Sequence, residues 1–267
     1  MVKSNLHTHT KYSDGENTAE ENVLEAIEKG FVSLGFSDHS YTEFDLTYCM
    51  KAQNEDDYRN EIISLRDKYR GEIEVYCGIE LDGYSERPEN NKYDYIIGSC
   101  HYLNLDGKYY SVDHCIEGHK MILEEFFGND TQEFAKKYFA TMTECTRLHK
   151  PDIIGHFDLV SKFGFMKEDS AEYRDALLES LVSCLEVTPI IELNNGSLSR
   201  GIRTVPYPAP YVLPEIKSHG GKILISSDSH KKCNLDYAFE DMVELIKKYG
   251  INSIVVLKNG QFSEIGI

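Results

Sequence analysis

The sequence is short of basic side chains and has no pair of cysteines with the spacing of a metal-binding or redox motif. Its 28 Lys and Arg residues are outnumbered by 45 Asp and Glu residues, which gives a formal net charge of −17. This charge opposes the attraction to phosphate backbones that nucleic-acid binding needs, so the composition argues against a DNA or RNA partner. The seven cysteines are odd in number and never spaced as Cys-x-x-Cys, so they indicate neither a disulfide framework nor a thiolate zinc site.

The sequence also has no apolar run long enough to span a bilayer, and its first residues lead directly into a predicted strand rather than an export signal. We therefore expect no membrane partner and a cytoplasmic location, which suits unpaired cysteines. No internal repeat or Pro/Gly-rich linker divides the chain. With 41% hydrophobic residues over 267 positions, residues 1–267 are expected to form a single domain. The composition does not indicate an oligomeric state.

Short strands rich in Val, Ile, Leu and Phe alternate with amphipathic helices along the whole chain. The predicted strands are residues 2–6, 31–37, 73–79, 95–99, 152–155, 190–193, 222–226 and 251–257. The predicted helices are residues 18–29, 55–69, 131–149, 171–185 and 237–249. This alternation favours seven or eight parallel βα units. Residues 104–130 are longer than a barrel connection needs, so we expect a partly helical insertion there, over the active face.

Histidines and acidic residues recur where these strands end. The nine candidate ligands are His7, His9, Asp14, His39, Glu80, His101, His156, Asp228 and His230. In a (β/α) barrel the carboxyl ends of all strands converge on one face, so residues distant in sequence become neighbours there. Imidazole and carboxylate groups are ligands that divalent metals take. The pattern therefore predicts a multinuclear metallohydrolase.

The residues around these positions resemble the polymerase-and-histidinol-phosphatase (PHP) family over essentially the whole chain. The motifs that carry the resemblance are His7-Thr8-His9 with Tyr12-Ser13-Asp14-Gly15, Gly35-Phe36-Ser37-Asp38-His39, Gly78-Ile79-Glu80, Ser99-Cys100-His101, Gly155-His156 and Ser227-Asp228-Ser229-His230. The insertion after His101 and the segments 192–196, 199–201 and 206–208 are similar to the histidinol-phosphate phosphatase branch.

The resemblance implies an α/β fold, a distorted (β/α)7 TIM-like barrel with its active site at the carboxyl ends of the strands, and three divalent ions. It assigns the first ion to His7, His9, Glu80 and Asp228. The second ion is assigned to Glu80, His101 and His156, and the third to Asp14, His39 and His230. Some relatives have histidine at position 14, so Asp14 departs from that variant. Zn, Mn and Fe all accept mixed imidazole and carboxylate ligands, so residue types do not identify the metal.

For this branch the resemblance implies hydrolysis of L-histidinol phosphate to L-histidinol and inorganic phosphate, a reaction of histidine biosynthesis. A phosphate monoester dianion repels hydroxide, so its hydrolysis needs charge neutralisation and a prepared nucleophile. Clustered ions provide both, with Glu80 bridging two of them. The leaving alkoxide also needs a proton or an ion, and Asp228 and His230 are the candidate general acids.

Contacts to the phosphate beyond the ions are expected from Arg200 and Arg203, because a guanidinium matches two phosphate oxygens. Lys162 and Tyr207 are further candidates. Of the four remaining histidines, His149 and His219 are expected at the surface, whereas His114 and His119 are candidates for the substrate mouth. Acidic groups would favour the cationic groups of histidinol phosphate, and the candidates are Glu43, Asp45, Asp113, Glu117 and Asp158.

Three alternatives stay open at this point. The first is a PHP phosphoesterase or exonuclease that acts on nucleotides, other small phosphate esters or nucleic-acid ends, although the acidic composition opposes the exonuclease. The second is a metal-binding module without catalysis. The third is hydrolysis of an amide or lactone on a related barrel.

Overall fold

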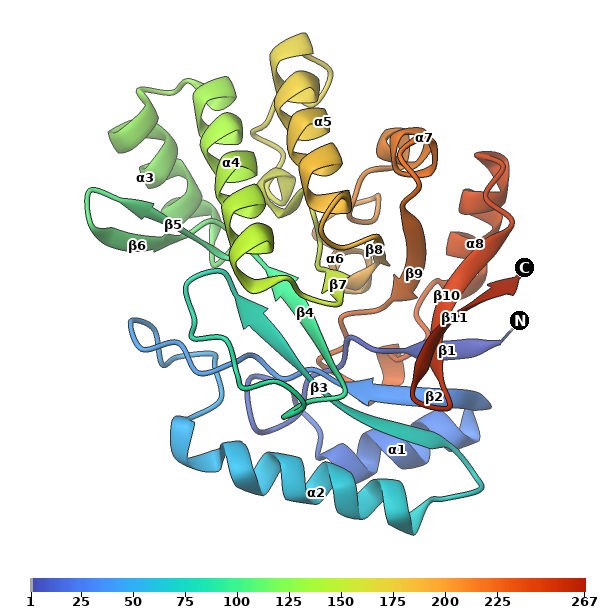
Figure 1. The fold of residues 1–267 in the computed structure, drawn as a ribbon. Helices are drawn as coiled ribbons and strands as arrows, with labels where there is room; N and C mark the ends of the chain where they lie inside the picture. The colour runs from blue at the N-terminus through green and yellow to red at the C-terminus, as the bar shows by residue number, and fades with distance from the viewer. Residues whose placement is uncertain (1) are drawn as a thin grey trace.

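A single parallel sheet of seven strands curves into a nearly closed barrel in the computed structural model, which describes residues 2–267 (Figure 1). Its strands, in the order in which they pair, are β1 (Lys3–Asn5), β2 (Phe31–Phe36), β3 (Glu74–Asp82), β4 (Tyr95–Ser99), β7 (Ile153–Ile154), β8 (Ile190–Asn194) and β9 (Lys222–Ser226). This arrangement confirms the predicted distorted TIM-like barrel.

The barrel closes between its first and last strands at the carboxyl end. Thr8 and Ser229 form a parallel bridge just beyond β1 and β9. The His9 N–H donates to the Ser229 carbonyl at 2.9 Å, and the Ser229 N–H donates to the His7 carbonyl at 3.1 Å. The two strands thus meet at the histidine motif itself.

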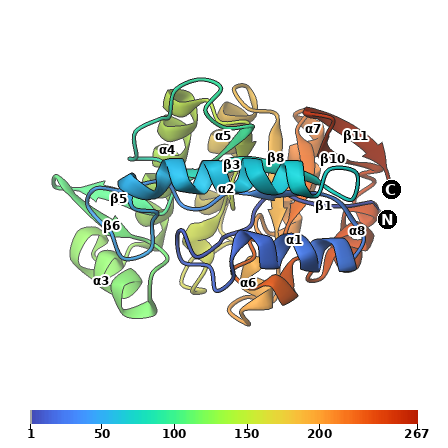
Figure 2. The same ribbon diagram turned by 90° about the horizontal axis from the view of Figure 1, so that it is seen from below.

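Helices surround the barrel on the outside (Figures 1 and 2). They are α1 (Ala19–Glu28), α2 (Glu55–Lys68), α4 (Thr131–His149), α5 (Ala171–Leu185), α7 (Leu213–Ser218) and α8 (Phe239–Lys248). The short α6 (Gly196–Ser199) instead lies at the carboxyl end of β8. α1 begins with a capping box in which Thr18 and Glu21 satisfy each other's backbone N–H groups. Within the described residues no helix is both long and apolar enough to cross a membrane.

The strand predicted at residues 251–257 is not a further barrel strand. It corresponds to β10 (Ser253–Lys258), which pairs antiparallel with β11 (Gln261–Gly266) in a separate hairpin. Val255 and Leu257 of this hairpin pack with Leu6 and Tyr95 in the interior of the barrel. The strand pattern was correct, but its apolar residues close the amino-terminal end of the barrel instead of extending the sheet.

The segment after His101 leaves the barrel as a hairpin and a helix. These are β5 (Tyr102–Leu105), β6 (Lys108–Ser111) and α3 (Ile116–Phe127). The Val112 N–H donates to the His101 carbonyl at 2.8 Å, so the chain returns to its point of departure before α3 begins.

The prediction that His149 lies at the surface is wrong. It is the last residue of α4, and only 6% of it is exposed. Its Nε2 lies 2.9 Å from the Gly83 carbonyl, because the end of α4 packs against the loop that follows β3. His219 is exposed, as predicted.

Two glycines leave room for a buried tyrosine at the centre of the barrel. The hydroxyl of Tyr95 donates to the carbonyls of Leu6 and Phe36. A Cβ atom on Gly78 would lie 2.2 Å from the Tyr95 ring, and one on Gly35 would lie 2.4 Å from its hydroxyl. Tyr95, the first residue of β4, therefore links β4 to β2 and to the end of β1, and its ring fits there only while Gly35 and Gly78 lack side chains.

We expect Gly78→Ala to lower the free energy of unfolding by about 1–3 kcal/mol, because the methyl group overpacks a closed core. Gly118→Ala is the control, since the nearest atom to its added Cβ is the Cys115 Sγ at 3.4 Å. Urea denaturation of both variants measures the difference. Equal stability of the two variants would contradict this account of the core.

Candidate metal centre

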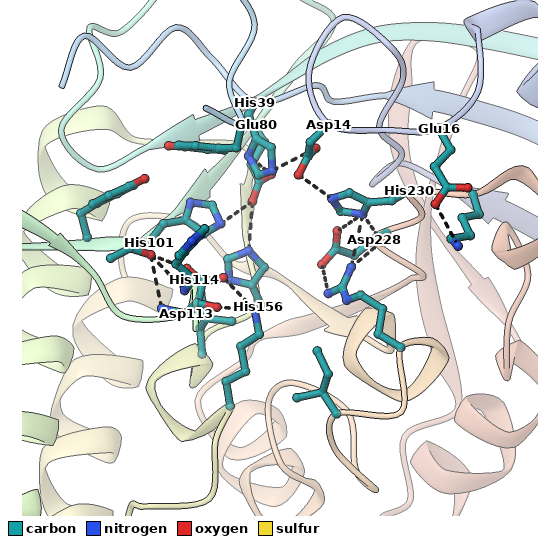
Figure 3. A pocket seen from close by; sticks show the side chains of 18 residues that line it. Asp14, Glu16, His39, Glu80, His101, Asp113, His114, His156, Asp228 and His230 are labelled. Carbon is teal, nitrogen blue, oxygen red and sulfur yellow. Dashed lines mark hydrogen bonds and ion pairs between the residues drawn. The ribbon is translucent and has the colours of Figure 1, made fainter. Parts of the chain in front are cut away.

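A cavity of about 420 Å³ opens at the carboxyl face of the barrel (Figure 3). Seven of the nine predicted ligands line it, and the other two, His7 and His9, are buried beside Glu80. Together the nine come from six strands. His7, His9 and Asp14 follow β1, His39 follows β2, Glu80 lies in β3, His101 follows β4, His156 follows β7, and Asp228 and His230 follow β9. The convergence of parallel strand ends thus brings residues more than 200 positions apart into one site.

Glu80 lies at the centre of this group, and only 1% of it is exposed. Its Oε2 faces three imidazoles, with His39 Nδ1 at 2.8 Å, His7 Nε2 at 3.2 Å and His9 Nε2 at 3.6 Å. Its Oε1 faces the other side, with His156 Nε2 at 3.0 Å and His101 Nε2 at 3.4 Å. The two oxygens of one carboxylate therefore point into two different groups of imidazoles.

A third group lies nearer the cavity mouth. His230 Nε2 lies 3.2 Å from Asp14 Oδ2, and His39 Nε2 lies 3.7 Å from Asp14 Oδ1. The His9 ring stacks on that of His230 with their centroids 4.2 Å apart. His9 Nε2 also lies 3.2 Å from Asp228 Oδ1, so His9 stands between the inner and the outer groups.

Burial and opposite charge perturb the ionisation of these residues. Burial disfavours an imidazolium, but the carboxylates of Glu80, Asp82 and Asp113 together outweigh it and raise the pKa of His101 to about 9. Burial prevails at His9, where the neighbouring imidazoles of His230 and His39 add to it and lower the pKa to about 3. Burial also disfavours the charged form of Glu80, yet the imidazoles of His39 and His7 hold its pKa well below the usual range. Without bound ions, protonated imidazoles thus supply part of the positive charge that balances the carboxylates.

The donor atoms fit divalent metal ions. Several buried ring nitrogens and one carboxylate oxygen have no hydrogen-bond partner among the described residues, namely His7 Nε2, His9 Nδ1 and Nε2, His101 Nδ1, His156 Nδ1 and Glu80 Oε2. In each of three groups of residues, the donor atoms lie within 4.8 Å of one another. The groups are His9, Asp14, His39 and His230; His7, His9 and Glu80; and His39, Glu80 and His101. Buried polar atoms without partners are costly, and mixed imidazole and carboxylate donors are what such ions bind.

Two carboxylates that the sequence analysis did not identify as site residues orient these imidazoles. Glu192 Oε2 lies 2.9 Å from His7 Nδ1, and Glu192 Oε1 accepts from the His156 N–H at 2.6 Å. Asp82 Oδ2 lies 3.3 Å from His101 Nδ1 and accepts from the His101 N–H at 3.1 Å. The carboxylate at His7 Nδ1 holds the proton there, which leaves His7 Nε2 free as a ligand. Asp82 instead fixes the position of His101 through its backbone N–H. Their signal in the sequence is an acidic residue within an apolar strand, as at Glu80.

Two of the four predicted phosphate-binding residues line the cavity and two do not. Arg200 and Lys162 line the cavity, and the Arg200 guanidinium lies 3.2 Å from Asp228 Oδ2. Arg203 does not line it. Its guanidinium stacks on the ring of Tyr207 at 4.7 Å and bonds to Ser161, and Tyr207 is itself only 1% exposed.

The predicted mouth residues are also divided. His114 lines the cavity, whereas His119 is fully buried and places its Nδ1 2.8 Å from the Val112 carbonyl. Among the five acidic candidates for binding a cationic substrate group, Asp113 alone lines the cavity. The remaining four are Glu43, Asp45, Glu117 and Asp158.

Comparison with known proteins agrees with this geometry. The model of the PHP domain family matches residues 5–196. The chain is 24% identical to a histidinol-phosphatase of Bacillus subtilis, over 91% of this chain and 99% of that one. It is 25% identical to a probable histidinol-phosphatase of Schizosaccharomyces pombe, over 97% of this chain and 90% of that one. The crystal structure of a histidinol phosphate phosphatase from Lactococcus lactis, in complex with zinc, L-histidinol and phosphate, superposes with a TM-score of 0.74 at 21% identity, over 98% of each chain.

We expect Glu192→Gln to weaken metal binding by about 10- to 100-fold, as losses of such orienting partners do. The backbone N–H of His156 and the side-chain amide of Asn194 both need an acceptor, so the oxygen of the new glutamine must face them. The NH2 group of the glutamine then faces His7 Nδ1 and donates to it, which moves the His7 proton to Nε2. Calorimetric titration of metal-free protein with Zn²⁺ or Mn²⁺ measures the affinity.

The matched control for Glu192→Gln is Asp152→Asn, which alters an exposed carboxylate bonded to the Ile96 N–H. Equal affinity in the two variants would show that Glu192 does not orient His7.

Proposed function

The chain belongs to the PHP domain family, and from this premise we propose that it is a metal-dependent phosphatase that hydrolyses L-histidinol phosphate to L-histidinol and inorganic phosphate. The observation that carries the proposal is the placement of Glu80, whose two oxygens face separate groups of imidazoles in a cavity that Arg200 also lines. The relatives that are histidinol-phosphatases support the substrate. A role in histidine biosynthesis follows from that reaction.

Three divalent ions would be held by this site, in the groups assigned from the resemblance. His7, His9, Glu80 and Asp228 would hold the first, Glu80, His101 and His156 the second, and Asp14, His39 and His230 the third. Bound ions of this kind lower the pKa of water and neutralise phosphate charge. Zn, Mn and Fe are all compatible with these donors.

Arg200 binds the phosphate in this proposal. Its guanidinium lines the cavity, where it donates to Asp228 Oδ2 at 3.2 Å and lies 3.3 Å from His230 Nδ1. A planar fork matches two oxygens of a phosphate. In this proposal Arg200 holds the phosphate at the part of the cavity wall formed by Asp228 and His230.

The leaving alkoxide must gain a proton, and the two candidates differ in their ability to supply one. Burial acts against the charged form of Asp228, but the neighbouring Arg200 and His7 hold the pKa of this carboxyl well below its usual range. Asp228 is therefore ionised at neutral pH and carries no proton. This leaves His230, whose Nδ1 lies 3.1 Å from the Asp228 carbonyl, as the candidate proton donor, a role it can fill only when it is not a ligand of the third ion.

The free state of all seven cysteines, which lie within the described residues, supports a cytoplasmic location for the enzyme.

The proposed function is tested with a panel of phosphate monoesters and elemental analysis of the same preparation. We expect the highest kcat/KM for histidinol phosphate, loss of activity with a chelator, and recovery with Zn²⁺, Mn²⁺ or Fe²⁺. A preference for nucleoside phosphates would identify a nucleotide phosphoesterase instead. Turnover of amides or lactones without phosphatase activity would overturn the proposal, as would the absence of any turnover.

We expect His230→Asn to lower kcat for histidinol phosphate by about 10²- to 10⁴-fold, the usual contribution of a positioned acid. The loss should be much smaller for 4-nitrophenyl phosphate, because its phenolate leaves without a proton. Metal content is measured alongside. Equal losses on both esters, together with loss of an ion, would show that His230 acts only as a ligand.

A further inference from the structure

Two carboxylates line the cavity in addition to the candidate metal ligands, and they differ in their surroundings. Glu16 pairs with Lys231 at 2.8 Å, and both side chains are more than half exposed to solvent. Asp113 pairs with Lys162 at 3.0 Å, and their side chains are only 20% and 13% exposed. Solvent screens the first pair, whereas the charges of the second act inside the site.

Asp113 is held in place from three directions. The Lys162 ammonium donates both to its carboxylate and, at 2.7 Å, to its backbone carbonyl. The Ser111 hydroxyl lies 3.2 Å from its other carboxylate oxygen. The preceding residue, Val112, bonds to the His101 carbonyl at 2.8 Å. In Figure 3 Asp113 accordingly lies beside His101 and His156, on the side of the cavity away from Asp14 and His230.

This position is unfavourable for an ordinary phosphate ester. A phosphate monoester is a dianion, and a carboxylate fixed close to its binding site repels it, with little screening inside a partly closed cavity. Lys162 offsets part of this repulsion, since its ammonium lines the same wall. The pair thus presents a negative and a positive group side by side, which complements a substrate that carries a phosphate and a cation close together.

Resting on the proposed function, we propose that Asp113 determines specificity by binding the ammonium group of the substrate, with Lys162 holding it at the cavity wall. The enzyme then selects phosphate monoesters that bear an ammonium group near the phosphate. Simple phosphate esters meet the same carboxylate without a compensating charge, so one residue both attracts the correct substrate and disfavours the others.

The test compares histidinol phosphate with 3-(imidazol-4-yl)propyl phosphate, the same ester with hydrogen in place of the amino group. The measured quantity is the ratio of kcat/KM for the two esters. We expect Asp113→Asn to reduce this ratio by about tenfold or more, since it removes the carboxylate that pairs with the substrate ammonium inside the cavity. Inhibition by L-histidinol should weaken by a similar factor.

Glu16→Gln is the matched control, because it removes the screened carboxylate at the same cavity and should preserve the ratio. Melting temperature and metal content establish that Asp113→Asn is folded. Asp113→Ser is a second variant that removes the carboxylate with a different side chain. A wild-type preference for histidinol phosphate that survives in both Asp113 variants overturns the inference and leaves the proposed function intact. A wild-type enzyme that hydrolyses neither ester overturns the proposed function, and the inference with it.

Discussion

A carboxylate removed from solvent must be compensated, and at Glu80 this requirement organises the carboxyl face of the barrel. The side chain belongs to a strand that is buried along almost its whole length, so water is not available to it. Five imidazoles supply the compensation, divided between its two oxygens. Because a buried charge without partners costs several kcal/mol, the site is stable only with protons or metal ions among those nitrogens.

The barrel makes this arrangement possible by fixing the strand ends relative to one another. Tyr95 ties three strands together through two carbonyls, and Thr8 pairs with Ser229 where the first and last strands meet. Glu192 then links His7 to the backbone of His156 across the barrel interior. The imidazoles are thereby oriented by the scaffold before any ion binds, which reduces the conformational entropy that binding has to overcome.

The sequence was sufficient to predict the barrel and to find the nine candidate ligands, because each is a polar residue at the end of an apolar strand. It was less informative where the decisive contact is between distant segments. Glu192 resembles Glu80 in its strand, and only the three-dimensional structure shows that it lies behind His7 and does not line the cavity. His149 has the pattern of a helix terminus, and its burial depends on the loop at Gly83.

Arg203 illustrates the same difficulty. It follows Arg200 by three residues and has the same chemistry, yet its guanidinium stacks on Tyr207 and lies near Glu168. The last predicted strand was found at the correct residues, but periodicity alone does not distinguish a strand that extends a sheet from one that plugs a barrel. Its antiparallel partner decides this, and the pairing is set by the turn at residues 259–260.

The geometry also separates the chemistry from the choice of substrate. Candidate metal ligands come from strand ends, which are held by the sheet and tolerate little movement. Asp113 and His114 directly follow the excursion that leaves the barrel at His101 and returns to it at Val112. Because this excursion begins and ends at one hydrogen bond, its length and sequence can change without moving the strand ends, as is general for loops on rigid scaffolds. A barrel of this kind can therefore keep its metal site while the insertion after β4 determines which phosphate ester enters it.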